Sequence, residues 1–311
     1  MGLFDGSPSA ADLAARFRLP VLAVVDASAM AGTFAALAFG LQHYRSGLPW
    51  AGVLANRVAR ERHAGMLQQS LRDPQDWLGA IRADAALALP ERHLGLVAPE
   101  DSSDALARLD AAADALAATP LGQLSPADLQ RWSVAFAAPV GAAAAAAPLL
   151  HGKTVAVARD AAFCFIYAAN LDCLRQLGAQ LVFFSPLTDT ALPPCDALWL
   201  PGGYPELHAD TLSANQSLRQ SVAAHLAQGK PIWAECGGMM ALFDTMVTLD
   251  GKSHAMWGLL PGGVTMQRRL AALGPQQLVV GDQVLRGHTF HHSTCETPLA
   301  AQERTCAPGQ R

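Results

Sequence analysis

The sequence predicts an α/β protein in which two parallel sheets, one in each half of the chain, are joined by a linker. Short apolar runs alternate with helix-forming segments in both halves, which is the pattern of parallel strands connected by helices. An alanine- and proline-rich stretch of low complexity, residues 135–151, separates the two halves. A length of 311 residues also suits two domains. We therefore expect domains over residues 1–134 and 152–311.

The N-terminal half is expected to form a parallel sheet covered by helices. The run 19–26 is apolar throughout, as is usual for parallel strands that are covered on both faces. The other expected strands cover 50–56 and 77–81, and the expected helices cover 10–17, 32–44, 61–71, 101–118 and 126–132. Residues 1–6 have the character of a strand end and its following loop.

The C-terminal half is expected to form a flavodoxin-like sheet. Its expected strands cover 153–159, 180–184, 198–200 and 231–234, and its expected helices cover 167–177, 218–228 and 239–243. After Trp257 the pattern is irregular, with strand-like pieces at 277–280 and 283–286, which favours an antiparallel extension at the edge of the sheet. Catalytic groups in such folds lie beyond the carboxyl ends of the strands.

Composition limits the class of function. Hydrophobic residues make up 51% and charged residues 15% of the chain, as in a well-buried globular protein, and a net charge of -4 gives no electrostatic reason to expect nucleic acid or an anionic membrane as partner. Six cysteines without CxxC pairs favour a reducing compartment. Neither a membrane-spanning apolar run nor a secretory leader pattern occurs, so the expected location is the cytoplasm.

Cys236 is the candidate catalytic nucleophile. It follows an apolar run that ends at Ala234 and precedes Gly237, Gly238 and an apolar helix-forming stretch. This order predicts a strand, a sharp turn and a helix, and such a turn presents a nucleophile above the end of a sheet. The N–H of Gly237 would then point to where an oxyanion forms, at the positive end of the helix. The alternative is a buried core cysteine.

Two further segments complete an acyl-transfer pattern. Pro201-Gly-Gly-Tyr-Pro-Glu206 also follows an apolar strand, and its Gly202–Gly203 turn could supply a second backbone N–H to the oxyanion. The segment 286–293 contains His288, His291 and His292 as candidate bases. A cysteine, a histidine remote in sequence and a glycine loop are the parts that acyl transfer needs.

These three segments resemble the class I glutamine amidotransferase domain of cobyrinate a,c-diamide synthases and cobyric acid synthases. Residues 158–165 resemble the segment that opens this domain, and residues 1–6 and 24–27 resemble the a,c-diamide synthase branch. The resemblance covers nearly the whole chain. It implies that Cys236 attacks the side-chain amide of L-glutamine, that His291 is the base, and that Gly203 and Gly237 hold the oxyanion. Many class I enzymes carry a carboxylate at the position of Ser293. The cobyrinate and cobyric acid branch is similar to this chain in lacking that carboxylate, which implies a less firmly oriented base.

The N-terminal half resembles the ATP-binding amidoligase domain of these synthases, a P-loop fold related to dethiobiotin synthetase. The resemblance implies ATP and Mg2+ as cofactors and suggests Asp5, Asn56 and Arg57 as nucleotide- or substrate-binding residues. A turn aspartate and a solvated arginine are the alternatives. No G-x-x-x-x-G-K-[ST] motif, the phosphate-binding P-loop, occurs in the chain. Residues 152–154 match the end of this motif, but Ala147 stands where its first glycine is required. No metal-binding residue is assigned, since residues 291–295 lack a second ligand pair at zinc spacing.

The resemblance implies ATP-dependent, glutamine-hydrolysing amidation of the a and c side-chain carboxylates of cobyrinate or hydrogenobyrinate in cobalamin biosynthesis. A cobyric acid synthase-type amidotransferase is one alternative. A catalytically incomplete fragment that keeps a glutaminase-like domain is another. The missing P-loop motif and the residues after Glu296 favour a chain shortened at both ends and inactive as a synthase. A homodimer is the one candidate assembly, and the sequence does not fix the oligomeric state.

Overall fold

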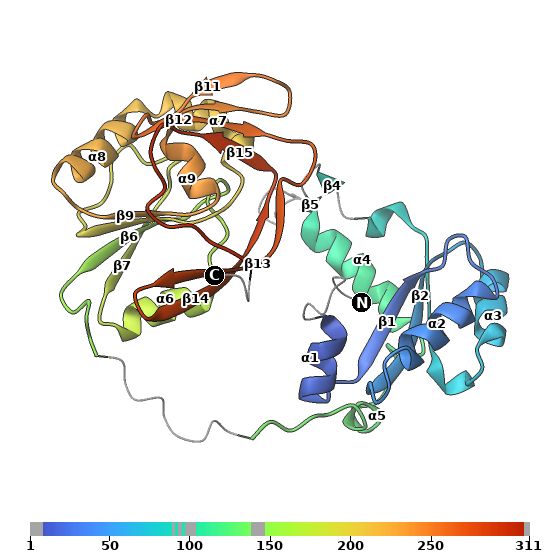
Figure 1. The fold of residues 1–311 in the computed structure, drawn as a ribbon. Helices are drawn as coiled ribbons and strands as arrows, with labels where there is room; N and C mark the ends of the chain where they lie inside the picture. Colours follow the sequence, from blue (N-terminus) through green and yellow to red (C-terminus); the bar gives the residue numbers. More distant parts are fainter. Residues whose placement is uncertain (1–8, 89–90, 93–94, 97–103, 138–146, 308–311) are drawn as a thin grey trace. The chain divides into compact units, whose positions relative to one another are not determined.

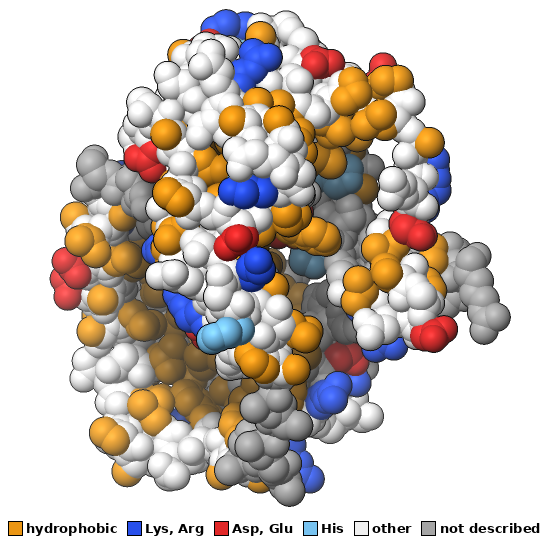
Figure 2. Space-filling view, turned by 90° about the vertical axis from the view of Figure 1, so that its left-hand side faces the viewer, with side chains coloured by type: hydrophobic (Ala, Val, Ile, Leu, Met, Phe, Trp, Pro, Cys, Tyr) orange, Lys and Arg blue, Asp and Glu red, His pale blue; other side chains and the backbone are white. Residues whose placement is uncertain are grey.

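The computed structural model describes residues 9–88, 91–92, 95–96, 104–137 and 147–307. Contacts within the chain divide it into two compact units, Met1–Val140 and Gly141–Arg311, and both are drawn in Figure 1. In the part of the chain that the structure describes, no helix is long and apolar enough to cross a bilayer. On the face shown in Figure 2, basic and acidic side chains are interspersed with hydrophobic ones, and neither sign forms a continuous patch.

The first unit is built on a three-stranded parallel sheet in the order β1-β2-β3. Its strands are β1 (Val21–Asp26), β2 (Trp50–Val58) and β3 (Trp77–Arg82). Helices α2 (Thr33–His43) and α3 (Glu61–Ser70) follow β1 and β2. The three strands confirm the predicted α/β pattern of this half, with ends that differ from the prediction by one or two residues.

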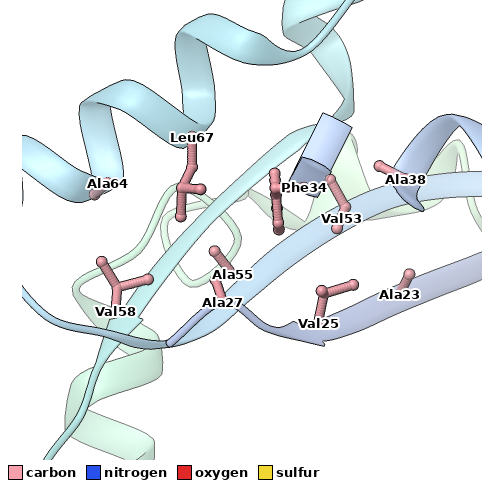
Figure 3. Packing of buried hydrophobic residues seen from close by; sticks show 10 residues of the cluster. All are labelled: Ala23, Val25, Ala27, Phe34, Ala38, Val53, Ala55, Val58, Ala64 and Leu67. Carbon is pink, nitrogen blue, oxygen red and sulfur yellow. The ribbon is translucent and has the colours of Figure 1, made fainter. Parts of the chain in front are cut away.

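The core of this unit lies between the sheet and these two helices. Figure 3 shows Phe34 and Leu67, one from each helix, pointing toward Val53 and Ala55 of β2. Phe34, Val53, Ala55 and Leu67 are each fully buried. Complete burial of a side chain the size of leucine or phenylalanine contributes about 1.5–3 kcal/mol. This apolar contact packs helices α2 and α3 against β2, the central strand of the sheet.

The remaining elements of the first unit are short or peripheral. Helix α1 (Ala10–Phe17) begins with a capping box, in which the side chains of Ser9 and Asp12 each accept a hydrogen bond from the other's backbone N–H. The other helices are α4 (Ala105–Ala117), α5 (Pro126–Gln130), η1 (Pro74–Asp76) and η2 (Ala85–Leu87), and a small antiparallel pair joins β4 (Glu91–Arg92) to β5 (Gly95–Leu96). The strand end expected at residues 1–6 lies outside the described residues.

The second unit contains a four-stranded parallel sheet in the order β7-β6-β8-β9. Its strands are β6 (Thr154–Ala158), β7 (Gln180–Phe184), β8 (Ala197–Leu200) and β9 (Ile232–Ala234). Its helices are α6 (Ala168–Gln176), η4 (Pro205–His208), α7 (Ala209–Ala214) and α8 (Gln216–Ala227). This strand order is that of a flavodoxin-like sheet. The chain adds β7 on one side of β6 and then β8 and β9 on the other side, so the topological switch point lies between β6 and β8. The predicted fold class is confirmed, and the loops beyond β6, β8 and β9 lie where such folds bind ligands.

The C-terminal strands differ from the predicted edge extension. Helix α9 (Gly237–Leu242) leads directly into β10 (Phe243–Val247), and a second sheet has the order β11-β10-β12-β15. The other members of this sheet are β11 (Ser253–Ala255), β12 (Leu260–Met266) and β15 (Ser293–Glu296). Among the described residues these strands pair with one another and not with the parallel sheet.

The strand-like pieces predicted at 277–280 and 283–286 belong to a longer hairpin. Strands β13 (Ala272–Val280) and β14 (Gln283–His291) pair along their whole length of nine residues each. Gly281 opens the two-residue loop between them with a φ of 59°, which favours this tight connection. The prediction was too short because the outer residues are mixed polar and apolar, so that cross-strand pairing, and not an apolar run, defines the strands.

Candidate active site

Cys236 occupies the sharp turn between β9 and α9. Its backbone has φ 50° and ψ -120°, whereas most residues with side chains avoid positive φ. Such strain is characteristic of functional turns, where the surrounding structure holds it in place. Cys236 is also exposed, unlike a core cysteine. The strained turn and the exposure of Cys236 therefore suit the predicted role of a presented nucleophile, and that role stays a prediction.

The two glycines after Cys236 are required by close packing. A Cβ at Gly238 would lie 2.1 Å from the carbonyl oxygen of Leu200, at the end of β8. A Cβ at Gly237 would lie 2.8 Å from Cδ of Pro205 and 3.0 Å from the backbone nitrogen of Gly203. The helix can begin this close to the neighbouring strand only because neither residue has a side chain.

The loop after β8 brings a second backbone donor to the cysteine. The backbone N–H groups of Gly237 and Gly203 face the Cys236 sulfur closely enough to lower the pKa of its thiol, and a Cβ on Gly202 would lie 3.5 Å from the sulfur. When a carbonyl carbon bonds to this sulfur, its oxygen lies within reach of donors grouped around the sulfur. The structure therefore brings together Cys236, Gly203 and Gly237, which the sequence predicted to act together.

The environment of the sulfur opposes ionisation. Burial of the thiol group by surrounding atoms raises the pKa of Cys236, although part of the residue is exposed. The N–H groups of Gly237 and Gly203 lower this pKa, and the carboxylates of Glu206 and Glu235 raise it. Because the net direction is upward, the resting side chain is mainly a thiol at neutral pH, and attack on a carbonyl needs a base.

We expect the alkylation rate of Cys236 by iodoacetamide to rise with pH through a midpoint above that of the same cysteine in the urea-unfolded chain, where an ordinary thiol titrates near pH 8.5. The thiolate is the reacting form, and folding raises the pKa of this thiol. Peptide mass spectrometry over a pH series measures the rate at this one cysteine. A folded-state midpoint at or below that of the unfolded chain would contradict the expectation.

His291 is the last residue of β14, and a backbone carbonyl orients its ring. Its Nδ1 lies 2.8 Å from the carbonyl oxygen of Ser293. A carbonyl can only accept, so in the neutral ring Nδ1 carries the hydrogen and Nε2 keeps its lone pair. The sequence suggested a poorly oriented base because the Ser293 side chain is not a carboxylate, but the backbone of the same residue supplies an acceptor.

The structure does not decide among the candidate bases. Within the part of the chain that it describes, no hydrogen bond joins His291 to the Cys236 sulfur. His288 is exposed on β14, and the buried Nδ1 of His292 has no hydrogen-bond partner among the described residues. The pairing of Cys236 with His291 therefore stays a prediction. Apo structures often show such contacts lengthened, because substrate binding completes them.

In the first unit, the predicted residues Asn56 and Arg57 lie at the carboxyl end of β2. The Asn56 side-chain oxygen accepts a hydrogen bond of 2.9 Å from the N–H of Arg57, whose φ is 58°. The Arg57 guanidinium forms an exposed ion pair of 3.1 Å with Asp26 at the end of β1. A hydrogen bond from the backbone N–H of Ser28 is the main cause that lowers the pKa of Asp26, and the charge of Arg57 lowers it further. The third predicted residue, Asp5, lies outside the described residues.

Asp26 is a site candidate that the sequence analysis did not single out. Its signal was present, because it is a polar residue that directly ends an apolar parallel strand. In the strand register Asp26 lies opposite Asn56. Among the described residues no group of three or more His, Cys, Asp or Glu side chains is arranged to hold a metal ion.

Comparison with known proteins agrees with this geometry. A family model described as a CobB/CobQ-like glutamine amidotransferase domain matches residues 154–307. The second unit is thus a glutamine amidotransferase domain of that class. The chain is 53% identical over 311 residues to hydrogenobyrinate a,c-diamide synthase of Stutzerimonas stutzeri (strain A1501), an alignment that covers 100% of this chain and 70% of the relative.

Two further relatives show the same correspondence. Hydrogenobyrinate a,c-diamide synthase of Pseudomonas aeruginosa PAO1 is 50% identical, over 100% of this chain and 70% of its own length. Cobyrinate a,c-diamide synthase of Herminiimonas arsenicoxydans is 48% identical, over 98% of this chain and 68% of its own length. The chain belongs to the cobyrinate and hydrogenobyrinate a,c-diamide synthase family.

Proposed function

We propose that the protein uses ammonia from L-glutamine for the ATP-dependent amidation of the a and c side-chain carboxylates of cobyrinate or hydrogenobyrinate. The proposal is supported by relatives that are named for this product and are about half identical in sequence. One observation carries the proposal that the second unit hydrolyses glutamine. Cys236 lies in a strained turn, and two backbone N–H groups face its sulfur.

In the proposed glutaminase reaction, His291 Nε2 accepts the thiol proton of Cys236 while the sulfur attacks the side-chain carbonyl carbon of glutamine. The N–H groups of Gly203 and Gly237 stabilise the oxyanion of the tetrahedral intermediate, and each such donor is worth about 3–4 kcal/mol. The intermediate collapses when the C–N bond breaks, and His291 returns the proton to the departing ammonia. Water, deprotonated by His291, then hydrolyses the thioester to glutamate and free thiol.

The first unit is proposed to use this ammonia. When bound, ATP and Mg2+ supply the activation of a carboxylate as an acyl phosphate. Asn56 and the Asp26–Arg57 pair would contribute to binding of the nucleotide or of the corrinoid carboxylates, because they lie together at the carboxyl edge of a parallel sheet. The cytoplasm is the proposed location, since the chain carries six free cysteines.

Two assays test the proposal separately. Glutamate release from L-glutamine reports the glutaminase, and mass spectrometry of cobyrinic or hydrogenobyrinic acid incubated with ATP, Mg2+ and glutamine reports the amidation. We expect glutamate release that depends on Cys236, and two successive exchanges of a carboxyl hydroxyl for an amino group. Glutamate release that is unchanged in Cys236→Ser would exclude the glutaminase mechanism. Amidation of other carboxylates would favour a cobyric acid synthase-type reaction.

Replacement of His291 by alanine should lower the kcat of glutamine hydrolysis by roughly 10²-fold, because the thiol then loses its general base. His288→Ala should change kcat less than about twofold, since the exposed side chain of His288 is not oriented by a comparable contact. Steady-state glutaminase assays on both variants measure the difference. A large loss in His288→Ala with little loss in His291→Ala would move the base to His288.

A further inference from the structure

The loop after β6 is held by one carboxylate. Asp160 Oδ1 accepts hydrogen bonds from the N–H groups of Ala162 (2.9 Å) and Phe163 (3.1 Å). Asp160 Oδ2 accepts from the Ser185 hydroxyl (2.9 Å) and the N–H of Leu187 (2.9 Å), both just after β7. Both carboxylate oxygens of Asp160 thus accept two hydrogen bonds each. They fix the conformation of residues 160–163 and connect these residues to the end of β7.

The same loop packs directly against Gly203, the proposed oxyanion donor. The carbonyl oxygen of Ala162 accepts a hydrogen bond of 2.9 Å from the N–H of Tyr204, and the N–H of Phe165 donates one of 3.0 Å to the carbonyl of Gly202. Gly203 lies between these two contacts, so close that a Cβ on it would be 2.2 Å from the oxygen of Ala162. A displacement of residues 160–163 must therefore displace Gly203.

We propose that Asp160 is a positioning residue that sets the place of the Gly203 N–H relative to the Cys236 sulfur. The inference rests on the proposed glutaminase function, because it assigns Asp160 to the oxyanion donor of that reaction. The connection runs from the Asp160 carboxylate through the backbone of Ala162 to Gly203, and from the Gly203 N–H to the sulfur. The residues at each step are described by the structure and lie close together.

The chemical consequence is specific. The Gly203 N–H lowers the pKa of the Cys236 thiol and is a proposed donor to the oxyanion. If Asp160 becomes asparagine, one acceptor oxygen is replaced by an amide NH₂ group, and backbone N–H groups of the loop lose their partner. The loop then moves to satisfy them. A shift of about 1 Å in a catalytic group is enough to cost roughly 10²-fold in rate.

The test compares Asp160→Asn with Asp189→Asn. Asp189 lies in the same region, where its carboxylate accepts the N–H of Ser185 at 2.7 Å, and among the described residues no hydrogen bond joins it to residues 201–206. In Asp160→Asn we expect kcat for glutamine to fall roughly 10- to 100-fold while KM changes less than about threefold. We also expect the pH midpoint of Cys236 alkylation to rise. Asp189→Asn should leave kcat and the midpoint near wild type.

The alkylation midpoint requires no turnover, so it separates the two proposals. If the wild type releases no glutamate but the midpoint still rises in Asp160→Asn alone, the positioning role stands and the glutaminase proposal fails. If Asp160→Asn does not fold, Ser185→Ala removes one hydrogen bond from the same carboxylate, and its midpoint should rise by a smaller amount. An unchanged midpoint and kcat in folded Asp160→Asn, or equal changes in Asp189→Asn, would overturn the inference.

Discussion

Replacement of Cys236 by serine should lower the rate of glutamine hydrolysis at least about 10⁴-fold, with little change in stability. The serine hydroxyl keeps the shape of the side chain but is a far weaker nucleophile than the thiolate, and the thioester pathway is lost. Serine is close in size to cysteine, its hydroxyl can accept hydrogen bonds where surrounding atoms bury the thiol, and it bears the same backbone strain, so we expect the free energy of unfolding to change by no more than about 0.5 kcal/mol. Glutamate release and urea unfolding measure the two effects.

The control for this experiment is Cys195→Ser, because Cys195 is a cysteine with a histidine partner in the structure. Its sulfur lies 3.7 Å from Nδ1 of His225 in a buried pair, and the His225 Nε2 is 3.3 Å from the carbonyl oxygen of Pro231. Burial raises the pKa of Cys195 and closes it to substrate. Activity should therefore survive in Cys195→Ser. Loss of activity in this variant, with activity retained in Cys236→Ser, would place the nucleophile elsewhere.

The Gly203→Ala substitution should lower kcat for glutamine by roughly 10³-fold, because the new Cβ cannot be accommodated without moving the loop. It would lie 2.2 Å from the carbonyl oxygen of Ala162, a backbone atom that no side-chain rotation can remove. When the loop moves, the Gly203 N–H leaves the Cys236 sulfur, and loss of one oxyanion donor costs about 10²–10³ in kcat. Overpacking should also destabilise the fold by about 1–3 kcal/mol.

The matched control is Gly65→Ala in helix α3, where a Cβ would meet nothing within 4 Å. We expect this variant to keep wild-type kcat and to be as stable as the wild type or slightly more so, since alanine favours a helix. Steady-state kinetics and urea unfolding of both variants give the comparison. If Gly203→Ala kept more than a tenth of the wild-type kcat, the Gly203 N–H would not be an important oxyanion donor.

The parallel strands and the nucleophile turn were predictable because their signals are local. Apolar runs mark buried parallel strands, so β1, β2, β6 and β7 were found close to their true ends. An apolar run followed by cysteine and paired glycines can form few structures other than a strand, a sharp turn and a helix. The close approach of Gly238 to Leu200 shows why the glycines are there.

The C-terminal sheets were less predictable because their strands are defined by their partners. Strand β14 is exposed along most of its length, and its sequence mixes Arg286, Gly287 and His288 with apolar residues. Pairing with β13 supplies the hydrogen bonds that make it a strand. The orientation of His291 by the Ser293 carbonyl was hidden for a similar reason, since a side-chain pattern does not show where a backbone carbonyl points.

The α/β class, the sharp turn at Cys236 and the glycines that pack beside it could be predicted from the sequence alone. These depend on residue type and on the order of neighbours along the chain, which local sterics translate directly into a turn. The three-dimensional structure was needed to show that Asp26 pairs with Arg57, and that the Asp160 carboxylate holds the loop under Gly203. Such contacts join the ends of strands that are far apart in the sequence, and the order and register of the sheet bring them together.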